Sequence, residues 1–406
     1  MKSVFNNNEG IGGYEQLEYL VPVVQPTEYN WTRQLTQDVP LAPKMRKIAS
    51  VKDRMIHEID NFNTFIVLSS NEVLIVDSDS KLLNEHNSRL LSVKDDGTIK
   101  EVYRVEKAGK RALSPIFNVN GDLLLVTSSD SREQKYYLIC LSGQYSLKWE
   151  LEFSKPVSCN AVVDNSANIY IYLQSDGKYD GELLSISSDG HINWSVKLMG
   201  PINHQPPILL NNNNILVGIQ SYYMYVINKK GTVERKFEEW SFGSEIWMPF
   251  IDRSGLAYLK DEVYNMNLDL VSDYSPKGIH FNLHPLVDNN GNKYVVLDDR
   301  RIACINNQNQ IIWTVKHKGD MFRQPIIGRN GLCSFSLGGG GYIPASFIQI
   351  IDMNGNLKWE SPPIKGAIQS ILPSGDNRLY ALVNVRYYNS KRDGNFKVSW
   401  ELYEIS

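Results

Sequence analysis

Short runs of alternating apolar and polar residues fill most of the chain, and polar clusters rich in Gly, Asn, Asp and Ser separate them. Typical stretches are "PIFNVNGDLLLV" (115–126), "AVVDNSANIYIYL" (161–173), "PILLNNNNILVGI" (207–219) and "PLVDNNGNKYVVL" (285–297). A period of two is typical of β-strands, and the clusters supply the residues that tight turns need. No segment shows a convincing helical period, so the pattern predicts an all-β protein.

A second recurring unit follows the first and consists of a strand, a polar turn and another strand. Copies include "SVKDDGTIKEVYRV" (92–105), "SISSDGHINWSVKL" (185–198), "ACINNQNQIIWTV" (303–315) and "QIIDMNGNLKWES" (349–361). A register position upstream, often proline, falls near residues 65, 115, 161, 207, 249, 285, 325 and 371, so successive copies lie 36 to 50 residues apart. Eight units of four short strands predict an eight-bladed β-propeller.

The two ends of the chain are expected to share one blade. The last copy stops at "SWELYEIS" (399–406), which matches a third strand, and "YNWTRQL" (29–35) resembles an isolated fourth strand. We expect strand 29–35 to complete the last blade, so that no sheet edge is left open. The predicted organisation is an N-terminal extension over 1–28 and a single propeller over 29–406, with 36–60 as an insertion.

The repeat, a polar turn followed by about three residues, a tryptophan and a short proline-led strand, resembles the pyrroloquinoline-quinone (PQQ)-like propeller repeat over roughly residues 29–406. The resemblance implies that the repeat tryptophans dock between neighbouring blades; they are Trp31, Trp149, Trp194, Trp313 and Trp359. Blades one, four and five lack this tryptophan, so we expect them to pack less regularly.

Quinone-dependent dehydrogenases with this repeat carry a vicinal cysteine pair and a set of calcium-binding carboxylates. The four cysteines of this chain are not adjacent, so the resemblance extends to the fold and not to PQQ, and we expect no cofactor; they are Cys140, Cys159, Cys304 and Cys333. Three of them lie in alternating apolar runs and are expected to be buried thiols in strands; these are Cys140, Cys304 and Cys333.

Propeller topology predicts where a site would lie. The loops from each fourth strand to the next blade share one face with the loops between second and third strands, and we call this the funnel face. Residues just ahead of the register positions should line it. The ligand-binding candidates are Arg111, Asn160, Gln205, Trp247, Asn282, Arg323, Gln324 and Gln369, and the catalytic candidates are His204, Glu245 and His284. The funnel of any propeller is wet and collects polar residues, so a purely structural explanation stays open.

The loops on the funnel face differ in length. Those between second and third strands are long in blades seven, eight, one, two and three and short in blades four to six. We expect the insertion 36–60 on the same face. Together these loops predict a half-walled funnel, which is a plausible binding site.

The stretch "SSDGHINW" (187–194) places Asp189 beside His191 and resembles a catalytic or metal-binding pair. The repeat instead assigns both residues to a turn on the face opposite the funnel, with Gly190 supplying backbone freedom. Turns such as "DNNGN" and "DNSAN" imitate calcium loops but lack the EF-hand spacing and its closing glutamate, so we expect no metal site.

Composition and charge disfavour some classes of binding partner. The 406 residues carry a formal charge of −3 without a dominant basic stripe, which disfavours nucleic acid. No apolar run is long enough to span a membrane, and no signal peptide is seen. We therefore expect a cytoplasmic protein, with secretion left open if a signal was removed before the numbering began, and a monomer.

Three functions remain open at this stage. The first is a non-catalytic binding or scaffold propeller that recognises a protein, peptide, small molecule or glycan at the funnel face. The second is an enzyme, a lyase, cyclase or transferase, with His204 or His284 as acid, base or nucleophile and Glu245 as its partner. In that case Arg111 or Arg323 would bind an anion. A structural subunit of an envelope assembly is a third alternative, against which the missing lipoprotein signal counts.

Overall fold

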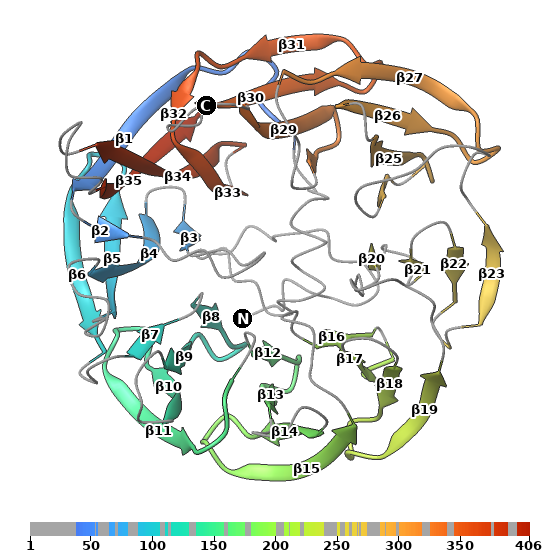
Figure 1. Cartoon of the computed structure of the whole chain (residues 1–406). Helices are drawn as coiled ribbons and strands as arrows, with labels where there is room; N and C mark the ends of the chain where they lie inside the picture. The colour runs from blue at the N-terminus through green and yellow to red at the C-terminus, as the bar shows by residue number, and fades with distance from the viewer. Residues whose placement is uncertain are drawn as a thin grey trace.

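The computed structural model arranges the described strands as eight sheets in a ring (Figure 1). The described residues are 38–52, 54–55, 65–69, 72–79, 88–105, 110–112, 115–129, 135–157, 161–174, 180–199, 207–210, 212–219, 223–238, 250–251, 256–259, 262–265, 267, 269–273, 285–288, 290–297, 300–318, 325–338, 345–374, 377–388 and 396–406. Every regular element among them is a β-strand, so the all-β, eight-bladed propeller predicted from the sequence is confirmed.

Each of the first four blades has four antiparallel strands in chain order, with a short extra strand in blades 1 and 2. Blade 1 contains β2 (Arg54–Met55), β3 (Phe65–Ser69), β4 (Glu72–Asp79), β5 (Ser88–Lys94) and β6 (Ile99–Arg104). Blade 2 contains β7 (Lys110–Ala112), β8 (Ile116–Phe117), β9 (Leu123–Ser129), β10 (Tyr136–Leu141) and β11 (Leu147–Phe153). Blade 3 contains β12 (Val162–Val163), β13 (Ile169–Gln174), β14 (Asp180–Ile186) and β15 (Ile192–Met199). Blade 4 contains β16 (Ile208–Leu209), β17 (Ile215–Ile219), β18 (Tyr223–Ile227) and β19 (Val233–Glu238).

The remaining four blades follow the same plan, and the last one takes its outer strand from the N-terminal part of the chain. Blade 5 contains β20 (Phe250–Ile251), β21 (Ala257–Leu259), β22 (Glu262–Tyr264) and β23 (Leu270–Asp273). Blade 6 contains β24 (Leu286–Val287), β25 (Lys293–Val296), β26 (Arg301–Ile305) and β27 (Ile311–Lys316). Blade 7 contains β28 (Ile326–Ile327), β29 (Gly331–Gly338), β30 (Ala345–Asp352), β31 (Leu357–Glu360) and β32 (Ile364–Lys365). Blade 8 contains β33 (Ala367–Pro373), β34 (Leu379–Tyr388), β35 (Phe396–Ile405) and β1 (Met45–Lys52).

The inner strands begin where the repeat register predicts. The first strand of blades 1 to 7 starts at or one residue after the predicted position, and β33 of blade 8 runs through residue 371. Ile116, Ile208 and Ile326, the first residues of three of these strands, are each almost completely buried. The apolar residue at this position therefore anchors each inner strand against its neighbours.

The strand that closes the ring is β1, and this corrects the sequence-based assignment. Residues 45–52 pair antiparallel with β35, and Lys44 and Ser406 exchange two backbone hydrogen bonds of 2.7 and 3.0 Å. A strand from the N-terminal part completes blade 8 as expected, but it lies within 36–60, which we had assigned to an insertion. The stretch "MRKIASVK" has no tryptophan, so the tryptophan pattern could not find it; Trp31 and residues 29–35 lie outside the described residues.

The core lies between the blades and is largely continuous around the ring. One cluster of buried apolar residues extends from Ile66 in blade 1 to Leu332 in blade 7. A separate cluster joins blades 8 and 1 and contains the fully buried Trp400 and Phe65. The outer strands contribute less: β11, β15 and β27 alternate between exposed and half-buried residues along most of their length. Packing between sheets, and not an isolated sheet, therefore holds each blade.

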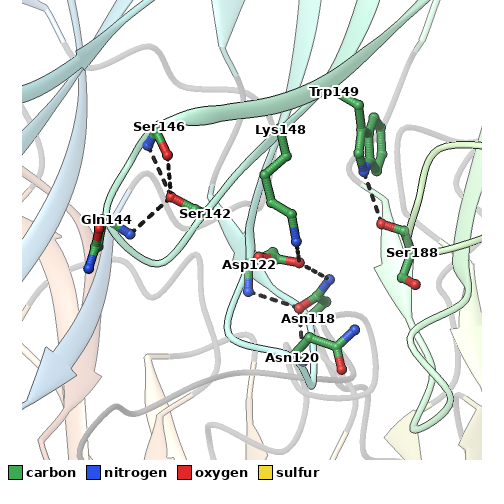
Figure 2. A network of polar contacts seen from close by, with 9 residues as sticks. All are labelled: Asn118, Asn120, Asp122, Ser142, Gln144, Ser146, Lys148, Trp149 and Ser188. Carbon is green, nitrogen blue, oxygen red and sulfur yellow. Dashed lines mark hydrogen bonds and ion pairs between the residues drawn. The ribbon is translucent and has the colours of Figure 1, made fainter.

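In each blade we call the turn between the first and second strands the inner turn, and the turn between the third and fourth strands the outer turn. Three contacts establish that these turns share a face. Lys148, next to the outer turn of blade 2, bonds to Asp122 in its inner turn at 2.8 Å (Figure 2). In blade 6, Asn307 of the outer turn donates to the carbonyl oxygen of Asn290 in the inner turn at 2.9 Å. Asn193 and Asn168 make the same connection in blade 3. The turns between strands one and two and between strands three and four therefore lie together, on what we call the turn face, and the other connections start at the opposite ends of these strands.

Candidate functional site

Most predicted funnel residues fall outside the described part of the chain, so their roles stay predictions. This group comprises His204, Glu245, His284, Asn160, Gln205, Trp247, Asn282, Arg323 and Gln324. Arg111 lies in β7, whose backbone pairs with β9, so it belongs to blade 2. All three catalytic candidates belong to this group, so their convergence stays a prediction.

Gln369 is the funnel candidate whose side chain the structure describes. It is the extra residue of a β-bulge in β33, because Ile368 pairs with Val383 and Ser370 with Leu382. Its side chain is 4% exposed, and its Nε2 donates to the carbonyl oxygen of Ala367 at 3.4 Å. A bulge re-aims the side chain that it carries. In this case the amide is held against its own strand, at the inner edge of blade 8.

The Asp189–His191 pair is part of an exposed turn, as its position in the repeat predicts. The His191 side chain is 83% exposed, and its Nε2 lies 3.6 Å from Asp189 Oδ2. The Ser187 hydroxyl donates to Asp189, and this hydrogen bond lowers the pKa of the Asp189 carboxyl. Gly190 has a φ of 88°, which the turn requires. These contacts define a turn on the turn face.

The turns that imitate calcium loops use their carboxylates for hydrogen bonds. In blade 3, Asp164 accepts from the backbone of Ser166 and Asn168 with one oxygen, and from the Tyr170 hydroxyl with the other. Asp288 of blade 6 repeats this arrangement with Asn290, Asn292 and Tyr294. Side chains that bond to the backbone two and four residues later stabilise such turns. Among the described residues, no group of three or more His, Cys, Asp or Glu is placed to hold a metal ion.

Three of the repeat tryptophans dock one blade onto the next, as the resemblance implies. The indole Nε1 donates to a turn carbonyl of the following blade: Trp149 to Ser188, Trp194 to Lys229 and Trp313 to Met353, at 2.9 to 3.0 Å (Figure 2 shows the first). Each ring also packs against the positive-φ glycine of that turn. A Cβ added to Gly355 would lie 2.7 Å from the Trp313 ring, which leaves room for glycine alone.

Two arginines perform the same docking where the tryptophan is missing. Arg235 occupies the tryptophan position of blade 4; its guanidinium donates to the carbonyl oxygen of Asn267 in blade 5 and pairs with Asp269 at 3.0 Å. At the joint between blades 8 and 1, Arg46 donates to the carbonyl oxygen of Asp95 at 3.1 Å. A guanidinium and an indole N–H both donate to a carbonyl from the end of a flat group. The alignment of the repeats would have identified Arg235; it could not identify Arg46.

Charges reinforce the joint at which the ring closes. Glu404 accepts from Arg46 at 2.7 Å and from Arg378 at 3.3 Å, and Arg378 also binds Asp95 of blade 1 at 2.7 Å. Burial opposes ionisation of Glu404, but hydrogen bonds from Arg46 and Ser406 and the charges of both arginines outweigh it, so its pKa is lowered. Tyr380 adds a hydrogen bond to Asp95 at 2.8 Å. This network links the first and last blades across the chain ends.

A buried Ser–His contact lies between blades 6 and 7, and the sequence offered no signal for it. His317 follows β27 and is 2% exposed; its Nε2 lies 3.0 Å from the hydroxyl of the buried Ser334 in β29. Burial lowers the pKa of His317 to about 4, although the charge of Glu360 opposes this shift. No described residue offers Nδ1 a hydrogen bond. Since both side chains are enclosed, the pair joins two blades and does not face a substrate.

The thiols behave as the alternating pattern predicts. Cys140, Cys304 and Cys333 are buried thiols in β10, β26 and β29, which confirms the expectation for these three. Burial raises the pKa of Cys140 to about 12 and that of Cys304 to about 11. Such thiols are poor nucleophiles at neutral pH. Cys159 lies outside the described residues.

No family model matches the chain, and no curated protein matches it. Among solved structures, the crystal structure of BamB from Moraxella catarrhalis is similar, with a TM-score of 0.48 and 13% identity over 88% of this chain and 97% of that chain. The structure of the Dos1 propeller is also similar, with a TM-score of 0.48 and 13% identity over 89% of this chain and 94% of that chain. No helix in the described part of the chain could cross a membrane.

Proposed function

We propose that this chain is a non-catalytic binding protein, a propeller that recognises a protein, peptide or glycan through its funnel face. The observation that supports this proposal is the regular start of the inner strands. Because the inner strands of blades 1 to 7 begin at equivalent positions of the repeat, we expect the segments that precede them to enter from the same side of the ring. Binding residues are commonly carried on loops that a rigid scaffold positions. An eight-sheet ring is such a scaffold.

The polar groups that the structure describes support binding over catalysis. Several described charged groups hold the fold together: Arg378 and Glu404 close the ring, and Arg235 joins two blades. The buried His317 also joins two blades. Recognition is therefore assigned to the segments that precede the inner strands, with Arg323 and His204 as polar contacts.

Partner capture with matched variants tests the proposal. The purified protein is immobilised, and a glycan array and a cell extract are screened against the wild type, His204→Ala and Arg323→Ala. His191→Ala and Lys230→Ala serve as controls, because both residues lie on exposed turns of the turn face. We expect the two funnel variants to lose about tenfold or more in affinity for the captured partner, as for removal of a contact worth about 1.4 kcal/mol.

The controls should retain the partner at wild-type affinity. If both funnel variants keep every partner and ligand that the wild type captures, the funnel face is not the binding surface. A captured small molecule that the wild type converts chemically, and that His204→Ala binds without conversion, would replace the binding function by the enzymatic alternative.

A further inference from the structure

Exposed apolar residues recur at one position of the outer strands. The position lies five residues after the start of each outer turn, and it holds Ile99, Leu147, Ile192, Val233, Leu270, Ile311 and Leu357. Because seven blades share it, exposure at this position is a property of the repeat. It does not distinguish one part of the rim from another.

The residue that follows this shared apolar position differs from blade to blade. It is the extra residue of a β-bulge, and in four blades it is polar and bonded: Lys148, Asn193, Glu234 and Lys358. Lys358, for example, pairs with Asp352 at 2.9 Å, and Glu234 accepts from Asn214 at 2.8 Å. In blades 5 and 6 the same position holds Val271 and Ile312, which are 55% and 54% exposed.

Blades 5 and 6 are neighbours, so the two apolar bulge residues, Val271 and Ile312, lie on adjacent blades. Together with Leu270 and Ile311 they place four exposed apolar side chains at equivalent positions of β23 and β27, which follow each other on the outer circumference (Figure 1). We call these four residues the rim patch. Two exposed apolar residues on each of two neighbouring blades, where the other blades carry one and a polar residue, favour an interaction surface.

Charges around the rim patch restrict what can cover it. On the side of blade 6, the turn 306–310 reads "NNQNQ", and no charged residue occurs from Ile302 to Val315. On the side of blade 5, Asp269 precedes Leu270 and pairs with Arg235 at 3.0 Å, and Asp273 ends the same strand. An anionic lipid surface needs several free cations near the apolar residues, and this arrangement does not supply them. The rim patch thus has uncharged amides on one side and an ion pair without net charge on the other. Such groups can form hydrogen bonds with a protein surface that carries the same groups.

We propose that the rim patch is the contact between two copies of this chain. Because its two halves occupy equivalent positions of neighbouring blades, a two-fold axis between them places β23 of one copy opposite β27 of the other. The Asp269–Arg235 pair then faces amides, which can donate to one partner and accept from the other, and no like charges meet. This proposal concerns the outer rim and is independent of the funnel face.

The exposed area is in the range of a weak dimer. Four half-exposed aliphatic side chains offer roughly 400 Å² of apolar surface per copy, against about 800 Å² that each partner buries in an interface of standard size. The amides of the turn 306–310 and the neighbouring backbone would provide the polar margin. A concentration-dependent equilibrium is therefore expected, and not a permanent dimer.

Sedimentation equilibrium of the full chain from about 1 μM to about 1 mM tests the contact. Val271→Lys and Ile312→Lys should each weaken the dimer by about tenfold or more, since each places a charge against an apolar side chain of the other copy. Both substitutions suit the fold, because the same bulge position holds Lys148 in blade 2 and Lys358 in blade 7. Asn193→Lys makes the same change in blade 3 and should leave the dimer unchanged.

A geometric measurement accompanies the equilibrium. Oxidation of the double variant Val271→Cys, Ile312→Cys should yield a covalent dimer, because the axis brings residue 271 of one copy to residue 312 of the other. A chain that stays monomeric over the whole concentration range would overturn the proposal, and the patch would then belong to a different partner. A dimer that both lysine variants preserve, or that Asn193→Lys dissociates equally, would also overturn it.

Discussion

At the scale of single residues, burial decides how His317 behaves as an acid. The ring is enclosed at the joint of blades 6 and 7 and lies in contact with the Ser334 hydroxyl. Burial favours the neutral imidazole and lowers its pKa from 6.5 to about 4. In the unfolded chain the same ring takes up a proton near its ordinary pKa. Folding is thereby coupled to pH through one side chain.

The sign of this coupling gives the first prediction. Above pH 6.5 the ring is neutral in both states; between pH 6.5 and 4 the unfolded state binds the proton and the folded state does not, so stability falls as the pH falls. From pH 7 to pH 5 we expect His317 to account for about 2 kcal/mol of the lost unfolding free energy. Urea denaturation of the wild type and of His317→Gln at both pH values measures this contribution.

The glutamine variant should lose about 2 kcal/mol less than the wild type between the two pH values. His191→Gln, on an exposed turn, is the matched control and should follow the wild type. If His317→Gln and the wild type show the same pH dependence, the imidazole is not held in its neutral form by burial.

At the scale of strands and turns, two different groups perform one task. A tryptophan or an arginine in the outer strand reaches a turn carbonyl of the next blade, through Trp313 in blade 6 and Arg235 in blade 4. The tryptophan adds ring packing against the turn glycine, whereas the arginine adds an ion pair with Asp269. The joint therefore requires a flat donor of a certain reach more than it requires an aromatic ring.

Removing the donor while keeping the ring separates the two contributions. Trp313→Phe should lower the unfolding free energy by about 1 kcal/mol more than Trp359→Phe, because it leaves the Met353 carbonyl without its 3.0 Å bond. Trp359 is the matched control: it faces blade 8, where two chain ends replace the outer turn. Equal losses in the two variants, measured by urea denaturation, would show that ring packing alone matters at this joint.

The same elements show what a sequence can and cannot predict. Spacing identified eight blades and the register of the inner strands, because turns and apolar alternation are local properties. It placed the closing strand at 29–35 because that reasoning followed tryptophan, and Arg46 does the docking instead. His317 and Ser334, 17 residues apart, meet only because two blades pack, and the alternation of either strand contains no trace of that contact. The funnel candidates keep their status as predictions.

At the scale of the whole molecule, the ring is held at one joint by charges from both ends of the chain. Arg46 comes from the first described strand, Glu404 and Arg378 from the last blade, and Asp95 from blade 1. Glu404 is largely buried and accepts hydrogen bonds from two guanidinium groups. A buried charge that loses its partner costs more than an exposed one, so this joint should be sensitive to the loss of a single carboxylate.

Glu404→Gln tests that sensitivity. The amide keeps the shape but leaves Arg46 without its anion and Arg378 with Asp95 alone, and we expect a loss of about 2 kcal/mol in unfolding free energy. Glu101→Gln is the matched control: Glu101 pairs with Arg104 on the exposed outer strand of blade 1, where a loss of about 0.5 kcal/mol or less is expected. Thermal and urea unfolding compare the two. Similar losses would mean that the closing joint carries no special electrostatic weight.

The meeting of the chain ends also predicts that the ring can be closed covalently. The backbone N–H of Ser406 donates to the carbonyl oxygen of Lys44, as that of Ser187 donates to the carbonyl oxygen of His191 across the outer turn of blade 3. Three residues separate Ser187 from His191, so a Ser-Asp-Gly linker from Ser406 to Lys44 should rebuild the same turn.

A circular permutant with this linker, opened between Asp189 and Gly190, should fold. Its reference is a linear chain that starts at Lys44, since both lack the contacts of Val39. The permutant should be at least as stable, because one turn is exchanged for another and the closing strand can no longer detach at an end. A single-glycine linker, too short for the turn, should lower the thermal midpoint; if both linkers gave equal midpoints, Lys44 and Ser406 would not meet as a blade turn.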